Sequence, residues 1–211
     1  FYIGSGTSGR LGVLDASECP PTFCTPPELV QGIIAGGDRS LRISSEGLED
    51  SSELALNDLK QKKFSSNDVL IGITASGKTP YVISGINYAK SLNALAISIS
   101  SVPIKDAVIK SDIDIRLITG PEVLAGSTRL KAGTATKMAL NIISTGVMIK
   151  LGKVYSNRMI DVSVSNKKLF ERALIILEDI ASVNKEEGIK LLNKTNGSVK
   201  TSLLLALSKL D

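Results

Sequence analysis

Two stretches of similar composition decide the fold, Gly4-Ser5-Gly6-Thr7-Ser8-Gly9-Arg10 and Thr74-Ala75-Ser76-Gly77-Lys78-Thr79-Pro80. Each one follows a short apolar run and opens a predicted helix. Glycines such as Gly77 let the backbone approach an anion closely, and the free N–H groups of a first helical turn then point at that anion. Both stretches also supply hydroxyl donors, namely Thr7, Ser8, Thr74, Ser76 and Thr79. They therefore predict a phosphate site.

Other ligands fit the same loops less well. A dinucleotide fold needs an acidic residue about 20 positions after its glycines, at the end of the second strand. Asp38 is the candidate here, and it comes late and is poorly placed. The second loop lacks the G-x-x-x-x-G-K-[ST] spacing of a nucleotide triphosphate loop. A tight turn that needs glycine without any ligand is an equal alternative for the first loop alone, and the second loop favours the phosphate interpretation.

The remaining chain alternates between apolar runs and helical patterns, which is typical of an α/β protein with crossover helices. We expect a doubly wound, parallel, five-stranded sheet flanked by helices, with the ligand near the carboxyl ends of its strands. The predicted strands are Phe1–Gly4, Val30–Ala35, Val69–Thr74, Ala94–Ile99 and Ile113–Leu117. The predicted helices are Gly9–Ala16, Glu49–Lys62, Thr79–Leu92, Ile104–Lys110 and Arg129–Leu151.

After Asp161 the pattern becomes entirely helical. Three helices are predicted, over Asn166–Val183, Lys185–Asn193 and Val199–Leu210, with a turn at Asn196-Gly197. The domain division expected is therefore 1–165 for the phosphate-binding domain and 166–211 for a small C-terminal helical domain. Such a unit is more typical of interaction or dimerisation than of catalysis.

Composition narrows the classes of function. With 211 residues, of which 43% are hydrophobic and 22% charged, the chain has enough apolar residues for one sizeable core. The net charge is +4, but the basic residues are scattered and only 4% are aromatic, so no nucleic-acid surface is expected. No apolar run reaches the roughly 18–20 residues that a membrane span needs. A small anionic substrate fits this composition.

The chain has no histidine, which removes the commonest zinc sites and every Ser-His or Cys-His catalytic pair. We expect no metal. Because histidine is absent, acid–base chemistry is left to carboxylates, lysine or tyrosine. The two cysteines, Cys19 and Cys24, are expected to be reduced thiols of a cytoplasmic protein. Because the sequence opens at Phe1 inside a strand, a preceding segment is expected.

Two groups of carboxylates are candidates for acid–base work. Glu18 precedes Pro20-Pro21, which are expected to end the first helix and hold the carboxylate at a rigid corner. The second group, Glu46-Gly47-Leu48-Glu49-Asp50, has more acids than a helix cap requires. An exposed helix end and ordinary capping are the alternatives.

A third stretch, Pro121–Thr134, again places hydroxyls and cations before a predicted helix. Ser127 and Lys131 are its candidates for a third wall of the anion site. A well-capped helix with its cations in solvent is the alternative.

These residues together resemble one family, the N-acetylmuramic acid 6-phosphate etherases. The resemblance runs in order from Phe1 to about Asn166, and the tail is similar to the small helical unit of the same enzymes. It is carried by the runs Ile3–Gly12, Leu14–Thr22, Ile34–Gly37, Glu46–Asp50, Ala75–Val82, Gly126–Ala135 and Leu151–Tyr155.

The resemblance implies a sugar isomerase domain and a homodimeric lyase without a cofactor. Such an enzyme releases D-lactate from N-acetylmuramic acid 6-phosphate and leaves N-acetylglucosamine 6-phosphate. It implies Glu18 as the acid that protonates the departing lactate and Glu49 as the base. A sugar-phosphate isomerase and a non-catalytic phosphosugar-sensing regulator on the same fold are the alternatives. The presence of both Glu18 and Glu49 favours the lyase.

Overall fold

The computed structural model describes residues 1–44, 46–162, 164 and 166–208. It divides into two compact units, unit 1 (Phe1–Glu18 and Pro27–Ile143) and unit 2 (Cys19–Pro26 and Ser144–Asp211). This division differs from the one expected at residue 165, because the last turns of two long helices group with the C-terminal residues. In the residues described, no helix is both long enough and apolar enough to span a membrane.

Unit 1 contains a five-stranded sheet in which every pair of neighbouring strands is parallel. The strand order is β2 (Gly32–Ile34), β1 (Tyr2–Gly4), β3 (Val69–Ile73), β4 (Leu95–Ser100) and β5 (Ile113–Arg116). The chain starts at an interior strand, β1, and crosses to β2 on one side and to β3, β4 and β5 on the other, which confirms the predicted doubly wound α/β fold. Gly4 pairs with Ile34 and Ile73, so the carboxyl ends of β1, β2 and β3 lie level.

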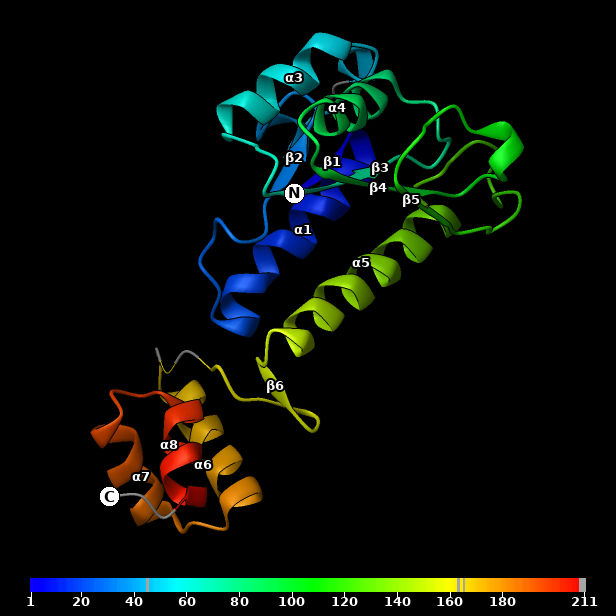
Figure 1. Ribbon diagram of the computed structural model, residues 1–211. Helices are drawn as coiled ribbons and strands as arrows, with labels where there is room; N and C mark the ends of the chain where they lie inside the picture. The colour runs from blue at the N-terminus through cyan, green and yellow to red at the C-terminus, as the bar shows by residue number, and fades with distance from the viewer. Residues whose placement is uncertain (45, 163, 165, 209–211) are drawn as a thin grey trace. The chain divides into compact units, whose positions relative to one another are not determined.

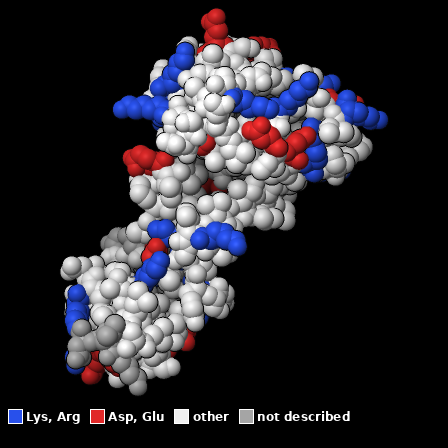
Figure 2. All heavy atoms as spheres, viewed as in Figure 1, with Lys and Arg blue, Asp and Glu red and all other residues white. Residues whose placement is uncertain are grey.

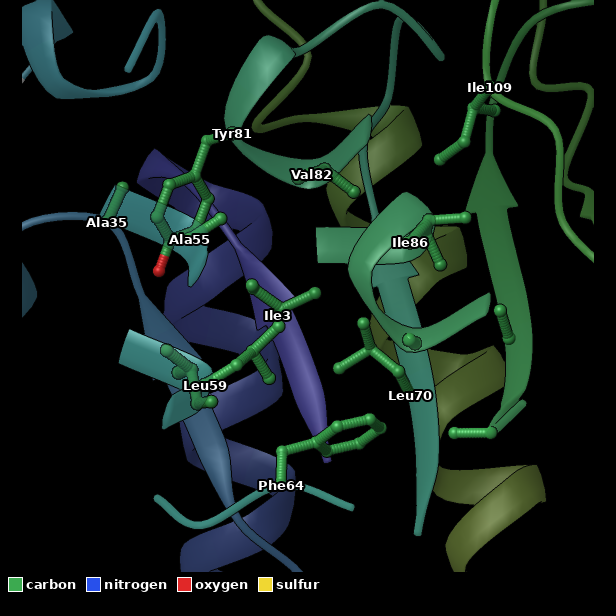
Figure 3. Packing of buried hydrophobic residues seen from close by; sticks show 14 residues of the cluster. Ile3, Ala35, Ala55, Leu59, Phe64, Leu70, Tyr81, Val82, Ile86 and Ile109 are labelled. Atoms are coloured by element: carbon green, nitrogen blue, oxygen red, sulfur yellow. The ribbon is translucent and has the colours of Figure 1, made fainter. Parts of the chain in front are cut away.

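Helices cover both faces of the sheet (Figure 1). The helices α3 (Ser52–Gln61) and α4 (Pro80–Ser91) lie on one face, and α1 (Gly6–Phe23) and α5 (Lys131–Lys150) on the other. Side chains alternate along β3 as the pleat requires: Leu70 belongs to the core under α3 and α4, whereas Ile71 belongs to the opposite core. Figure 3 shows Leu70 in its core, which it shares with Ile3, Leu59, Tyr81 and Ile86.

Two predictions about helix ends were wrong. Pro20 and Pro21 do not end α1, which continues to Phe23. Proline's fixed φ suits a helix, so near the last turn the pair costs two N–H donors without breaking the helix. The predicted helix over Ile104–Lys110 is a single 3₁₀ turn, Ile104–Asp106.

The chain beyond that 3₁₀ turn is extended because the N–H groups of Val108 and Ile109 both donate to the carbonyl of Gly77, at 3.1 and 3.2 Å. A tertiary contact therefore replaces the helical hydrogen bonds there.

The segment between β2 and α3 also differs from the expectation. The predicted helix start at Glu49 was wrong, because α3 begins at Ser52 and Glu49 lies in the turn before it. A short helix, α2 (Arg39–Arg42), and a 3₁₀ turn, η1 (Glu46–Leu48), come first. The guanidinium of Arg10 holds this segment by donating to the carbonyls of Ser40 and Leu41.

Unit 2 contains a two-stranded hairpin and three helices. The hairpin, β6 (Val154–Tyr155) and β7 (Arg158–Met159), was not predicted, since two-residue strands leave no periodic pattern. The helices are α6 (Lys167–Ala181), α7 (Lys185–Lys194) and α8 (Val199–Ser208), and their apolar faces share one core. The predicted turn at Asn196-Gly197 is confirmed, with positive φ at both residues. Leu210, the predicted helix end, lies outside the described residues.

Asp112 provides a test of the packing of β4 and β5. Its carboxylate accepts a hydrogen bond from the Ala96 N–H at 2.9 Å and lies 3.4 Å from the Lys90 ammonium. The Ala96 hydrogen bond, with a smaller contribution from Lys90, holds the pKa of Asp112 below its ordinary value. A carboxyl whose pKa is lowered on folding stabilises the fold above its unfolded-state pKa, and that stability is lost as the pH falls.

Asp112→Asn should therefore lower the midpoint of thermal unfolding at pH 7, and the difference from the unmodified chain should shrink as the pH falls below about 4. Thermal denaturation followed by circular dichroism at several pH values measures this. Asp106→Asn, in an exposed 3₁₀ turn, is the control. A deficit that is the same at every pH would contradict the assignment.

Candidate active site

A cavity of about 320 Å³ lies at the carboxyl ends of the strands in unit 1. It is formed by the loop that opens α1, the loop after β3, the turn before α3 and the start of α5. Its lining residues are Ser5, Gly6, Thr7, Ser8, Leu11, Glu49, Ala75, Ser76, Thr79, Gly126, Thr128, Ala132, Gly133 and Thr136. Hydroxyls and glycines dominate this lining, and Glu49 is the one ionisable residue among the described residues that form it.

The first loop turns from β1 into α1 so tightly that Gly4 and Gly9 leave no room for a side chain. A Cβ on Gly9 would lie 2.6 Å from the Gly4 carbonyl oxygen and from the side chain of Ile34. The N–H of Gly9 donates to Ser5, at 3.2 Å, so the first helical bond forms immediately after the strand. Thr7 and Ser8 consequently lie in the first turn of α1, which begins at Gly6 rather than at the predicted Gly9, and both line the cavity.

The second loop is held by its own hydroxyls. The buried Thr74 hydroxyl lies 2.8 Å from that of Thr79 and 3.4 Å from that of Ser76. Gly77 is buried with a φ of +66°, and a Cβ there would meet Ala107 at 2.6 Å. Ser76 and Thr79 line the cavity, whereas Thr74 and Gly77 support the loop from behind.

Glu49 is fixed through both its side chain and its backbone. Its Oε2 accepts a hydrogen bond from the Ser5 hydroxyl at 3.2 Å, and its carbonyl accepts one from the N–H of Tyr81 at 3.0 Å. The ion pairs found among the described residues do not include it. Its carboxylate is therefore directed at the cavity without a cationic partner in the described part of the chain.

Tyr81 itself does not serve as an acid or base. Its side chain is fully buried, and its hydroxyl donates to Asp58. Burial, and then the hydrogen bond to Asp58, raise the pKa of Tyr81 far above its ordinary value. The phenol stays protonated and joins α4 to α3.

The third stretch contributes different residues from those predicted. Ser127 and Lys131 do not line the cavity, and the Lys131 ammonium donates to the Pro121 carbonyl at 2.8 Å. Thr128 and Thr136 line it instead. The spacing of Thr136, three residues after Gly133 and so on the same helical face, is the signal that could have found it. For Ser5 the signal was its position inside the first glycine loop.

Glu18 is exposed and lies outside the cavity. It is 12 residues beyond Gly6 in α1, which at 1.5 Å per residue is about 18 Å along the helix axis. Since α1 runs away from the carboxyl ends of the strands, the structure does not bring Glu18 and Glu49 of one chain together.

The cavity is surrounded by neutral donors rather than cations. No lysine or arginine is among the described residues that line it. Basic and acidic side chains are interspersed over the face of the molecule in Figure 2. Among the residues described, no group of three or more His, Cys, Asp and Glu side chains is placed to hold a metal ion. An anion here would be bound by hydroxyls and backbone N–H groups.

Comparison with known proteins agrees with this geometry. Residues 53–145 match the family described as SIS domain, and residues 1–90 match the N-terminal SIS domain of glucokinase regulatory protein. Residues 156–202 match the C-terminal lid domain of glucokinase regulatory protein. A protein of Escherichia coli CFT073, solved with a bound ligand, is 14% identical, with a TM-score of 0.51 over 74% of this chain and 72% of that one, which shows a shared fold.

Curated relatives are much more similar in sequence. N-acetylmuramic acid 6-phosphate etherase of Prochlorococcus marinus strain NATL1A is 74% identical over 211 residues, covering all of this chain and 68% of the relative. The etherase of strain SARG is 63% identical, again over all of this chain and 68% of the relative. That of Parasynechococcus marenigrum strain WH8102 is 60% identical over all of this chain and 66% of the relative.

The fold and the cavity together define a SIS-domain protein, the α/β class named after sugar isomerases. Within that class the relatives identify one family. The chain belongs to the N-acetylmuramic acid 6-phosphate etherases and spans about two thirds of the length of the relatives it matches.

Thr7→Ala and Ser76→Ala test whether the two loops bind phosphate. Each substitution should weaken binding of glucosamine 6-phosphate by about 1–2 kcal/mol, because it removes one hydrogen bond to a charged group. Isothermal titration calorimetry measures this directly. Ser91→Ala, a serine at the far end of α4, is the matched control. Unchanged affinity in both loop variants would mean that the loops are structural turns.

Proposed function

We propose that this chain is a cofactor-independent carbon–oxygen lyase that cleaves the D-lactyl ether of N-acetylmuramic acid 6-phosphate. The products are N-acetylglucosamine 6-phosphate and D-lactate, and the reaction serves the recycling of cell-wall sugars. The observation that carries the proposal is 74% identity, over the whole chain, to a protein named for this activity. The cavity supports it with hydroxyls suited to a phosphate and a carboxylate suited to a base.

The chemistry follows from the open-chain form of the sugar. Its C2 proton is acidic because it lies next to the aldehyde, and its removal gives an enolate. The enolate expels the C3 substituent as lactate and leaves a conjugated enal, to which water then adds at C3. The reaction needs a base near C2 and an acid near the ether oxygen, and two carboxylates are sufficient for both roles.

We assign phosphate binding to Thr7, Ser8, Ser76 and Thr79, which line the cavity from two loops. Binding energy at the phosphate then orients the reacting carbons. We assign the base to Glu49, since Ser5 and the N–H of Tyr81 hold it at the cavity wall.

We further propose that Glu18 acts as the acid in the cavity of a second copy of the chain. Within one chain it is too distant, so its role requires a homodimer in which each cavity combines residues of both copies. Apolar side chains on α1 and α5 support such an interface: Leu14, Met138 and Ile142 are 47%, 60% and 71% exposed. Homo-oligomers of this kind are usually two-fold symmetric.

A cytoplasmic location completes the proposal. It is supported by Cys19 and Cys24, which carry thiols rather than a disulfide, as expected in a reducing compartment.

Deuterium exchange in the two glutamate variants should separate the roles of Glu49 and Glu18. Glu49→Gln should lose both exchange of the C2 hydrogen with solvent and lactate release, because no enolate forms. Glu18→Gln should keep the exchange and lose lactate release. Each loss should be at least 10²–10⁴-fold, as is typical of general acid–base groups.

NMR of the substrate in D₂O and a lactate assay measure the two steps. Exchange in Glu49→Gln but not in Glu18→Gln would reverse the roles. An isomerase or a phosphosugar-sensing regulator would release no lactate even without a substitution.

Mixing the two variants tests whether the site is shared. If each cavity uses Glu49 of one copy and Glu18 of the other, a mixed dimer of Glu18→Gln and Glu49→Gln subunits has one complete cavity. Co-refolding equal amounts should then restore about a quarter of the unmodified activity, since about half of the dimers are mixed and each has one working site of two. No recovery, with mixed dimers demonstrated by mass spectrometry, would place both carboxylates in one chain.

A further inference from the structure

Three helices begin at the cavity, and a helix N-terminus binds anions only where its first N–H groups are free. At α5 they are not free. The carboxylate of Glu122 accepts hydrogen bonds from the N–H groups of Lys131 at 2.9 Å and Ala132 at 3.0 Å. The next N–H, of Gly133, donates to the carbonyl of Thr128 at 2.9 Å. The protein itself therefore satisfies these donors at the start of α5.

The first N–H groups of α4 are also occupied, in this case by backbone carbonyls. Pro80 has no N–H, and the N–H of Tyr81 donates to the Glu49 carbonyl. The N–H groups of Val82 and Ile83 both donate to the carbonyl of Thr79, at 3.1 and 3.0 Å. The donors of this first turn are therefore already used within the protein.

The start of α1 differs from both. Among the hydrogen bonds of the described residues, none is donated by the N–H groups of Gly6, Thr7 or Ser8, and all three residues line the cavity. The first helical bond is that of Gly9. Free backbone donors and two hydroxyls therefore meet at α1, opposite the hydroxyls of Ser76 and Thr79.

A neutral side chain would also satisfy these N–H groups, whereas Glu122 adds a negative charge to the start of α5. The hydrogen bond from Ala132, and then that from Lys131, hold the pKa of Glu122 below its ordinary value, so the carboxylate stays ionised near neutral pH. Ala132 lies in the cavity wall, which places this negative charge directly behind the α5 side of the cavity.

We infer that Glu122 is a specificity-determining residue that excludes the substrate's phosphate from the N-terminus of α5 and restricts it to the donors of α1 and the loop after β3. The inference rests on the proposed function in that it takes a phosphosugar as the substrate. The uncharged part of the sugar then lies against the α5 wall, where Gly133 leaves space and Thr136 offers a hydroxyl.

This role predicts a kinetic signature that a merely structural cap would not give. Without the negative charge of Glu122, the N-terminus of α5 no longer repels an anion, and the substrate also binds in the reverse orientation. Bound but misoriented substrate lowers kcat and KM by the same factor and leaves kcat/KM unchanged. A damaged fold would instead lower kcat/KM.

The experiment compares Glu122→Gln and Glu122→Ala with Glu53→Gln, which removes an exposed acid from the first turn of α3 that is not among the residues lining the cavity. Inorganic phosphate is the probe, titrated by calorimetry into the full chain. Both Glu122 variants should bind phosphate about threefold to tenfold more tightly, the range expected when an anion gains a helix N-terminus. The Glu53→Gln control should bind it as the unmodified chain does.

Glu122→Gln keeps an acceptor for the N–H groups of α5 and removes only the negative charge. It therefore tests the effect of that charge on phosphate binding even where Glu122→Ala fails to fold. Unchanged or weaker phosphate binding in a folded Glu122→Gln overturns the inference. A drop in kcat/KM with KM unchanged also overturns it, because Glu122 would then be a structural cap. The phosphate titration requires no turnover, so absence of lactate release in the unmodified chain counts against the proposed function alone.

Discussion

The structure depends on one tight turn, where the chain leaves β1 and enters α1. Neither Gly4 nor Gly9 has room for a side chain, since an added Cβ would lie within 2.7 Å of the facing backbone. This close approach puts the first turn of α1 directly over the end of the central strands. The cavity exists there because a parallel sheet brings the carboxyl ends of β1 and β3 level. A wider turn would move the free N–H groups of α1 away from the second loop.

Backbone hydrogen bonds between distant segments hold the other walls of the cavity. The N–H of Ser101 donates to Ala75, those of Val108 and Ile109 donate to Gly77, and that of Tyr81 donates to Glu49. These bonds do not depend on long, flexible side chains, so the hydroxyls and the carboxylate are oriented before a ligand arrives. Such preorganisation lowers the entropy that binding costs and keeps the reacting groups in place.

The charges at the cavity follow a consistent pattern. Two cations of the loops that form it are engaged elsewhere: Arg10 holds the segment before η1, and Lys131 holds the Pro121 loop. Neutral donors remain for the phosphate, and the ion pairs of the described residues leave Glu49 without a cation to neutralise it. A lysine beside Glu49 would strengthen anion binding and would also weaken the carboxylate as a base. Neutral donors avoid that conflict.

The sequence by itself determined the α/β class, the five strands and the loops that carry Thr7, Ser8, Ser76 and Thr79, because glycine turns and apolar periodicity act over short distances along the chain. Tertiary structure decided which candidates meet. It separated Glu18 from Glu49, since α1 begins at Gly6 and a helix carries its residues steadily away from its start. It also turned Lys131 away from the cavity and placed Glu122 at the start of α5. Those pairings depend on segments folding back on one another, and no local pattern encodes them.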